Sequence, residues 1–209
     1  MPMTMVFDVL TMSGAGFALA ALTLWSRRRP GLSAPGRLVL LFTGIAVVLP
    51  ALGAAVSLFG DAPVRLAMTV TIMLTAWAAA MNAAVHLPLP SRYMTVRSAE
   101  RTFYRNPWSG VRAFGRLLRS TPLRTLGGTV YLHGRRNDAP AVTQGMLAAE
   151  AAHVWAVIVS IPLLLVWGIG AEWSALAGAL AVHLPLNIMP LLHLRHARSR
   201  LERALPPQR

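Results

Sequence analysis

Hydrophobic residues in this chain are grouped into five long runs, which polar or charged segments separate. The runs occupy residues 5–25, 38–59, 66–87, 146–169 and 173–194. A helix needs about 20 mostly apolar residues to cross the hydrocarbon core of a bilayer, and each run reaches that length. We therefore expect an all-α, polytopic membrane bundle of about five transmembrane helices, which forms a single integral-membrane domain over residues 1–209.

The segment between the third and fourth runs, at about residues 88–145, has a different pattern. In "WSGVRAFGRLLRS", apolar residues recur at helical spacing between Trp108 and Leu118, and Arg112, Arg116 and Arg119 fall between them. Such a pattern predicts a basic amphipathic helix that lies on the cytoplasmic membrane surface. It fits a plain anchoring helix and a substrate-binding helix equally well.

The distribution of charge predicts the orientation of the helices. All twenty basic residues are arginine, and ten of them lie between Arg92 and Arg136. Others follow the first run and fill the tail at 195–209, whereas the two remaining connections carry almost none. Positive charge favours the cytoplasmic side. We therefore expect a multi-pass protein of the inner (plasma) membrane, with its N-terminus outside and its C-terminus in the cytoplasm.

The composition supports a membrane protein. Hydrophobic residues make up 55% of the chain and charged residues only 13%, whereas a soluble domain carries about 25% charged residues. The net charge of +13 would suit nucleic acid, but the arginines flank membrane-length runs, so we expect no nucleic-acid partner. The chain has no cysteine, which excludes disulfides, thiolate metal sites and a cysteine nucleophile.

A few histidine, asparagine and glutamate residues lie inside the apolar runs, and by the predicted orientation all of them lie in the cytoplasmic half, whereas Asp8 lies at the opposite face. Ionisable groups in a membrane are costly and therefore indicate a functional site, although histidine and asparagine also join helices by hydrogen bonds. A di-metal centre would need several more inward carboxylates, so we expect no metal. The polar residues form three pairs at helical spacing: Asn82 with His86, Glu150 with His153, and His183 with Asn187.

Three motifs in residues 101–201 resemble one family of bacterial membrane enzymes. The first is the aromatic and basic segment "RTFYRNPWSGVRAFGRLLR", and the second is A-E-x-x-H at Ala149, Glu150 and His153. The third is Asn187, followed eight residues later by R-x-x-R-x-R-L. Together they resemble the glycosyl-4,4'-diaponeurosporenoate acyltransferase family. This resemblance implies transfer of a fatty acyl chain to the sugar of a carotenoid glycoside.

We therefore expect a membrane acyltransferase that moves a fatty acyl group from a cytoplasmic thioester donor to a hydroxyl of a membrane glycolipid or lipid. The expected partners are membrane lipids and the acyl donor, with acyl-CoA as co-substrate and no further cofactor. Association with a second copy or with another membrane protein stays open. The alternatives are a non-enzymatic scaffold or accessory subunit of a transporter or lipid-export complex, and a lipid carrier without chemistry.

The candidate catalytic residues are His153, Glu150, Asn187 and His183. We expect His153 to act as the general base for the acceptor hydroxyl and Glu150 to orient its imidazole ring. Asn187 or His183 would stabilise the oxyanion. The sequence places no serine or cysteine as a nucleophile, which favours direct transfer.

The candidate substrate-binding residues are mostly arginines, because their guanidinium groups match phosphate geometry. We expect the R-x-x-R-x-R cluster to bind an anionic donor, so that replacing its first two arginines raises KM more than it lowers kcat. The full set is Arg195, Arg198, Arg200, Arg112, Arg116, Asn82 and His86.

Overall fold

A computed structural model describes residues 3–27, 32–121 and 139–204. These parts of the chain are helical throughout, with turns between the helices and no strand. The long helices are α1 (Met3–Arg27), α2 (Ala34–Phe59), α3 (Pro63–Val85) and α7 (Ala139–Ile169), and a further long helix begins with α8 (Trp173–His183). It continues through a π-helical turn, Leu184–Ile188, into α9 (Met189–Ala204). The all-α prediction is confirmed.

Within the part of the chain that the structure describes, five helical segments are long and apolar enough to cross a membrane, which confirms the predicted number. They are Met3–Ser26, Ala34–Phe59, Pro63–Val85, Pro140–Ile169 and Trp173–Arg203. The fourth begins earlier and the fifth ends later than the hydropathy pattern predicts, because both helices continue past their apolar residues. The five helices fit a multi-pass membrane protein.

By its internal contacts the chain divides into two compact units. Unit 1 comprises Met1–Leu87 and Ala152–Asn187, and unit 2 comprises Pro88–Ala151 and Ile188–Arg209. Each unit is described below by itself, and the single integral-membrane domain stays a prediction. The predicted basic loop and tail lie partly outside the described residues, at 122–138 and 205–209, with Arg124, Arg135, Arg136 and Arg209.

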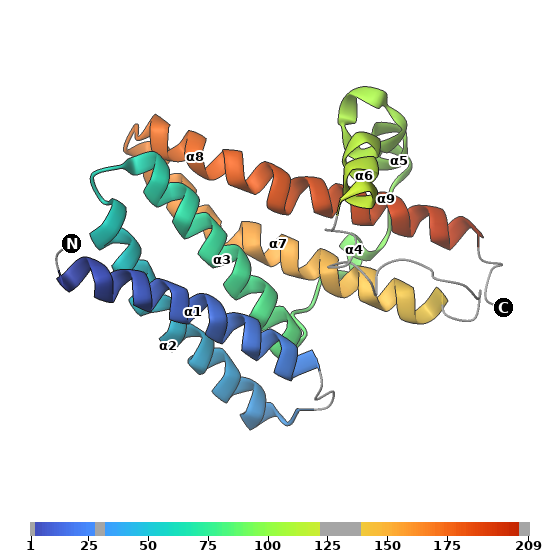
Figure 1. Cartoon of the computed structure of the whole chain (residues 1–209). Coiled ribbons are helices and arrows are strands. Elements are labelled where there is room, and N and C mark those ends of the chain that lie inside the picture. Colours follow the sequence, from blue (N-terminus) through green and yellow to red (C-terminus); the bar gives the residue numbers. More distant parts are fainter. Residues whose placement is uncertain (1–2, 28–31, 122–138, 205–209) are drawn as a thin grey trace. The chain divides into compact units, whose positions relative to one another are not determined.

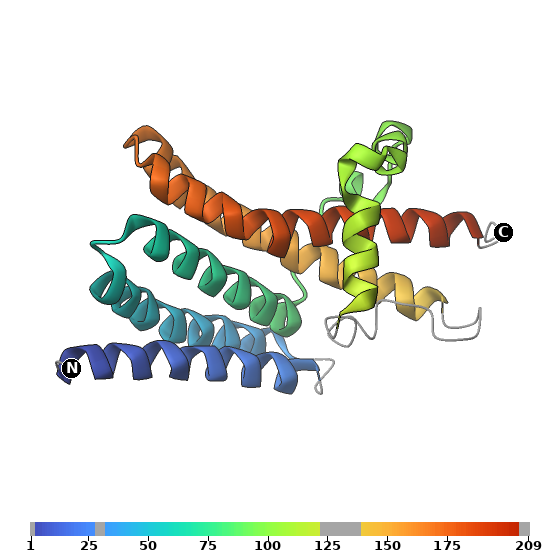
Figure 2. The same ribbon diagram turned by 45° about the horizontal axis from the view of Figure 1, so that its top comes forward.

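Unit 1 is a bundle in which α1, α2 and α3 lie side by side and α8 packs against α3 (Figures 1 and 2). Small residues allow this packing. Ala67 of α3 and Ala175 and Ala179 of α8 are buried against one another, and a Cβ at Gly178 would lie 2.9 Å from the Val64 carbonyl oxygen. Close approach of backbones at small residues is the usual way in which helices associate inside a bilayer.

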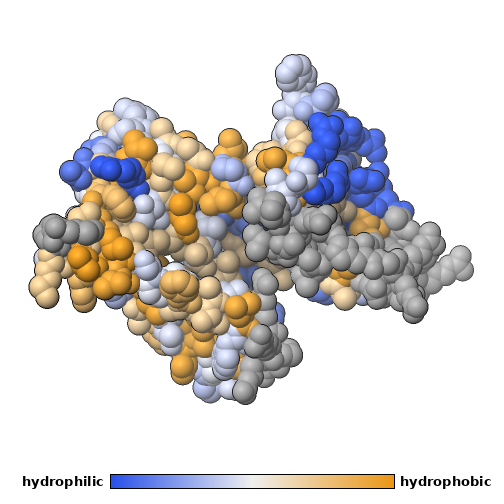
Figure 3. Space-filling view, viewed as in Figure 1, coloured by the Kyte–Doolittle hydropathy of each residue, from blue (hydrophilic) through white to orange (hydrophobic). Residues whose placement is uncertain are grey.

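The outer surface of unit 1 is apolar. Phe7, Phe17 and Phe42 are 70%, 78% and 65% exposed, and Figure 3 shows hydrophobic side chains over much of α1, α2 and α3. A soluble protein seldom leaves so large a continuous apolar surface uncovered. The surface therefore fits contact with lipid chains.

Unit 2 contains the short helices α4 (Ser91–Met94), α5 (Ser98–Arg105) and α6 (Val111–Ser120), together with α9 and the first part of α7. Val96, Tyr104 and Val111 form one buried cluster with Leu192 packed against it. The helix α6 crosses α9 at a steep angle (Figure 2). The basic amphipathic helix predicted from the sequence is thus confirmed as a helix, at α6.

The end of α3 differs from the sequence prediction. The helix ends at Val85, and His86 is an exposed cap residue with a left-handed backbone (φ 52°). Leu87 precedes Pro88, and a residue before proline is disfavoured in the helical region. The helix therefore stops short, and the argument that Asn82 and His86 share a helical face does not apply.

Candidate functional site

Asn187 is the centre of a buried hydrogen-bond cluster in unit 1. It lies in the π-helical turn Leu184–Ile188 and is fully buried. Its Nδ2 donates to the Thr75 hydroxyl of α3 at 2.9 Å and lies 3.0 Å from Nδ1 of His183. Its Oδ1 lies 3.4 Å from Nδ1 of His153 on α7. We call these four residues the histidine–asparagine cluster. Single π-helical turns inside α-helices are frequent at functional sites.

The partners of Asn187 determine which nitrogen of His153 is basic. The Thr75 hydroxyl donates its hydrogen to the Thr71 carbonyl oxygen at 2.8 Å, so toward Asn187 it only accepts. The amide nitrogen of Asn187 therefore faces Thr75, and its oxygen faces His153. Because that oxygen accepts, Nδ1 of His153 carries the hydrogen and Nε2 keeps its lone pair. Asn187 thus prepares His153 as a base.

His183 adopts the opposite tautomer. One hydrogen of the Asn187 amide goes to Thr75 and the other toward Nδ1 of His183, so Nδ1 accepts and Nε2 carries the hydrogen. His183 is 3% exposed, and its buried Nε2 has no hydrogen-bond partner among the residues that the structure describes. Leaving a buried hydrogen-bond donor without an acceptor costs about 1–3 kcal/mol of folding free energy. The Nε2 hydrogen of His183 is therefore a candidate donor to a bound ligand.

Glu150 has different partners from those expected. It lies in unit 2, is fully buried, and accepts two hydrogen bonds from Arg198, at 2.9 Å from Nε and 3.1 Å from Nη2. Nη1 of Arg195 lies 3.7 Å from the same carboxylate. These contacts are those of a structural ion pair. Asn187 is instead the side chain that contacts His153.

Arg195 and Arg198 are also buried and paired. Arg195 donates to Glu100 from Nη2 at 2.7 Å and from Nε at 3.0 Å, and its guanidinium lies over the Tyr93 ring at 4.0 Å. Arg198 also contacts Glu202 at 2.8 Å. Because carboxylates already occupy both guanidinium groups, this geometry favours a structural role for them over binding of a solvent-borne phosphate.

The ion pair between Glu100 and Arg195 predicts that the stability of the fold depends on pH. Burial opposes the charge of Glu100, but hydrogen bonds and charge from Arg195 outweigh it and lower the pKa of this carboxyl. Burial raises the pKa of Tyr104 to about 12, so its hydroxyl stays protonated and donates to Glu100 at 3.0 Å. A carboxyl with a lowered folded-state pKa stabilises the fold above its unfolded pKa of about 4.3, and this stabilisation disappears as pH falls through the folded value.

We therefore expect Glu100→Gln to lower the melting temperature of the detergent-solubilised protein at pH 7. The difference from wild type should shrink as the pH falls below about 4, where the wild-type carboxyl also becomes neutral. Thermal unfolding of both proteins across this range measures it. A difference that is the same at pH 7 and pH 3 would contradict the assigned ion pair.

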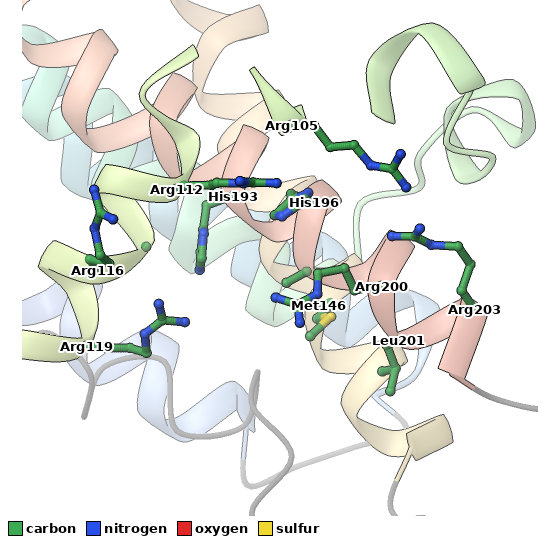
Figure 4. A pocket seen from close by; sticks show the side chains of 12 residues that line it. Arg105, Arg112, Arg116, Arg119, Met146, His193, His196, Arg200, Leu201 and Arg203 are labelled. Atoms are coloured by element: carbon green, nitrogen blue, oxygen red, sulfur yellow. The ribbon is translucent and has the colours of Figure 1, made fainter. Parts of the chain in front are cut away.

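A large pocket in unit 2 is lined by arginines that form no ion pair with the carboxylates that the structure describes. Its volume is about 880 Å³. Figure 4 shows arginines of α6 on one side and arginines of α9 on the other, with His193 and His196 between them. We call it the arginine pocket, and its six arginines are Arg105, Arg112, Arg116, Arg119, Arg200 and Arg203. The structure thus brings the predicted binding residues Arg112, Arg116 and Arg200 together.

Helical phase separates the two groups of arginines on α9. Positions 195, 198 and 202 recur at i, i+3 and i+7 and share the ion-paired face. Positions 193, 196, 200 and 203 share another face, which lines the pocket. All three carboxylates that the structure describes in unit 2, those of Glu100, Glu150 and Glu202, pair with Arg195 or Arg198.

Several residues of these sites were missed by the sequence analysis. Thr75 gave no signal, because a threonine in a helix ordinarily bonds its own helix, as this one also does. Glu100 lies in a short helix outside the apolar runs. Helical phase in α9 and α6 would have found Arg119, Arg203, His193 and His196, but not Arg105, which lies on α5. No group of three or more metal-binding side chains converges within residues 3–27, 32–121 and 139–204.

Comparison with known proteins gives one match. Neither the curated proteins nor the solved structures contain a match to this chain. The family model for glycosyl-4,4'-diaponeurosporenoate acyltransferase matches residues 90–206, which is more than half of the 209 residues. The matched region includes His153, Asn187 and the arginine pocket. The chain therefore belongs to the glycosyl-4,4'-diaponeurosporenoate acyltransferase family.

Proposed function

We propose that this protein transfers a fatty acyl group from a cytoplasmic thioester donor to a hydroxyl group of a membrane glycolipid or lipid. The family supports an acyltransferase, and the apolar helices fit an enzyme whose acceptor lies in the bilayer. The observation that carries the chemistry is the contact between Nδ1 of His153 and Oδ1 of Asn187, which leaves Nε2 of His153 as a base. The family's name suggests a glycosylated carotenoid as one form of acceptor.

The proposed reaction is a direct transfer. Nε2 of His153 accepts the proton of the acceptor hydroxyl, while the oxygen of that hydroxyl forms a bond to the carbonyl carbon of the thioester. The oxyanion that forms receives a hydrogen bond from Nε2 of His183, since both hydrogens of the Asn187 amide are already used. When the tetrahedral intermediate collapses, the carbon–sulfur bond breaks, and His153 returns the proton to the leaving thiolate.

Mass spectrometry of membrane lipids tests the proposed function. Cells that produce the protein should contain a lipid whose mass exceeds that of a second lipid by one fatty acid less one water. Cells in which the gene is deleted should accumulate the lighter lipid. If deletion changes no acylated lipid, and the protein co-purifies with one stoichiometric membrane partner, the scaffold alternative would replace the acyltransferase.

The proposed topology places the segment from Ser91 onward in the cytoplasm and Asp61 outside. Both side chains are exposed, and the chain has no cysteine of its own. Single cysteines at Ser91 and Asp61 should therefore react with a membrane-impermeant maleimide from opposite sides of the membrane. Labelling of both from the same side would contradict this topology and the cytoplasmic thioester donor.

A further inference from the structure

We propose that the arginine pocket binds the phosphate groups of a nucleotide-linked acyl thioester, a donor of the coenzyme A type. This inference rests on the proposed acyl transfer and identifies where its donor binds. The proposal stands on the charge of the pocket, on its volume and on the way in which its walls are built.

Uncompensated positive charge is the first argument. The described carboxylates of unit 2 pair with Arg195 and Arg198, and the structure gives none of the six pocket arginines an ion pair. Holding six guanidinium groups around one hollow is unfavourable unless anions occupy it. Guanidinium groups bind phosphate through paired N–H donors, and coenzyme A carries a pyrophosphate and a 3'-phosphate at one end.

The volume of the pocket fits a small molecule. Its volume of about 880 Å³ is in the range of about 300–1,000 Å³ that is usual for small-molecule sites. Basic pockets beside membrane helices can also bind anionic lipid headgroups, so binding of anionic lipid alone is one of the outcomes that the test below distinguishes. Met146, Ala197 and Leu201 also line the pocket and supply apolar contact for an adenine ring.

The pocket walls are closely fitted. A Cβ at Gly115 of α6 would lie 2.5 Å from Cε1 and 2.8 Å from Nδ1 of His193, so a larger residue at this position would require the His193 ring to move. The Phe114 ring packs edge-on against His193, with ring centroids 6.2 Å apart. These contacts fix α6 and α9 to each other and hold their arginines on opposite walls of one hollow (Figure 4).

Binding of coenzyme A to the protein in nanodiscs of neutral phosphatidylcholine tests the proposal. Pantetheine, which lacks every phosphate, should bind at least about 10-fold more weakly, since each hydrogen bond to a charged group is worth about one to two decades in affinity. The double variant Arg116→Gln/Arg200→Gln, with one change on each wall, should weaken coenzyme A binding by at least about 10-fold. Arg37→Gln/Arg65→Gln, which changes net charge equally in unit 1, is the control and should bind as wild type does.

Kinetics separate this proposal from the proposed function. The pocket variant should raise KM for dodecanoyl-coenzyme A but leave transfer from the dodecanoyl thioester of N-acetylcysteamine, which has no phosphate, unchanged. Transfer from the short thioester without coenzyme A binding would overturn the pocket assignment and leave the acyltransferase intact. Equal coenzyme A binding by wild type and the pocket variant would also overturn it, as would arginine-dependent binding of anionic lipid alone.

Discussion

Replacement of His153 by alanine is expected to lower the rate of acyl transfer by about 10²–10⁴-fold, which is the usual contribution of a positioned general base. The side chain contacts Asn187 but forms no ion pair that the structure describes, so the variant should insert and purify in normal yield. The measurement is kcat of the purified variant in nanodiscs with a dodecanoyl thioester.

Ser160→Ala is a matched control for this prediction. Ser160 lies on α7 two turns beyond His153 and is 2% exposed, and among the described residues its hydroxyl donates to the carbonyl oxygen of Ala156 in its own helix. Its replacement should leave kcat near the wild-type value. If His153→Ala keeps near-normal activity while the fold is intact, the base lies elsewhere, and His183 becomes the next candidate.

Replacement of Arg198 by glutamine is expected to destabilise the protein by about 3–5 kcal/mol. It leaves the buried carboxylate of Glu150 without the guanidinium group that donates two hydrogen bonds to it. Thermal unfolding in detergent measures the loss. Glu202→Gln is the control: Glu202 pairs with the same guanidinium, but its side chain is 41% exposed, so its replacement should have little effect.

The paired replacement Glu150→Met/Arg198→Met should be less destabilising than Arg198→Gln, since it removes both buried charges. This pattern distinguishes a structural ion pair from a donor-binding arginine. If Arg198→Gln unfolds as wild type does but raises KM for the acyl donor, Arg198 binds donor, as the R-x-x-R-x-R motif suggested.

The fold was largely predictable because hydropathy depends on composition over about 20 residues, and five runs of that length are plain in the sequence. The ends of the helices were harder to predict from the sequence. The stop of α3 at Val85 depends on one proline, and the π-helical turn at Leu184–Ile188 depends on how Asn187 bonds to other helices. Hydropathy contains neither kind of information.

The candidate site was predictable only in part. The sequence singled out His153, His183 and Asn187, and the structure brings them together through hydrogen bonds. The sequence pattern also paired Glu150 with His153, because their spacing places them on one helix face. Spacing cannot show, however, that Arg198, 48 residues away, forms an ion pair with the Glu150 carboxylate. Which side chains of distant segments form ion pairs depends on the tertiary structure, and a single sequence does not contain that information in readable form.

The same limit applies to the arginines. R-x-x-R-x-R looks like one cluster in the sequence, yet Arg198 is bound to Glu150, whereas Arg200 lines the pocket. A two-residue step on a helix rotates the side chain by about 200°, so these neighbours point to different sides. Whether the ion-paired or the pocket-lining arginines bind donor is therefore a question of geometry that the motif alone leaves open.

The stoichiometry of acyl transfer tests the proposed enzyme most directly, with wild-type protein in nanodiscs that contain extracted membrane lipids and dodecanoyl-coenzyme A. We expect one free thiol for each new lipid ester, with the ester located on a hydroxyl oxygen by mass spectrometry, and about 10²–10⁴-fold slower formation of both products with His153→Ala. Absence of an acylated lipid with every thioester donor tested, by a protein that is folded and inserted, would contradict the proposed acyl transfer.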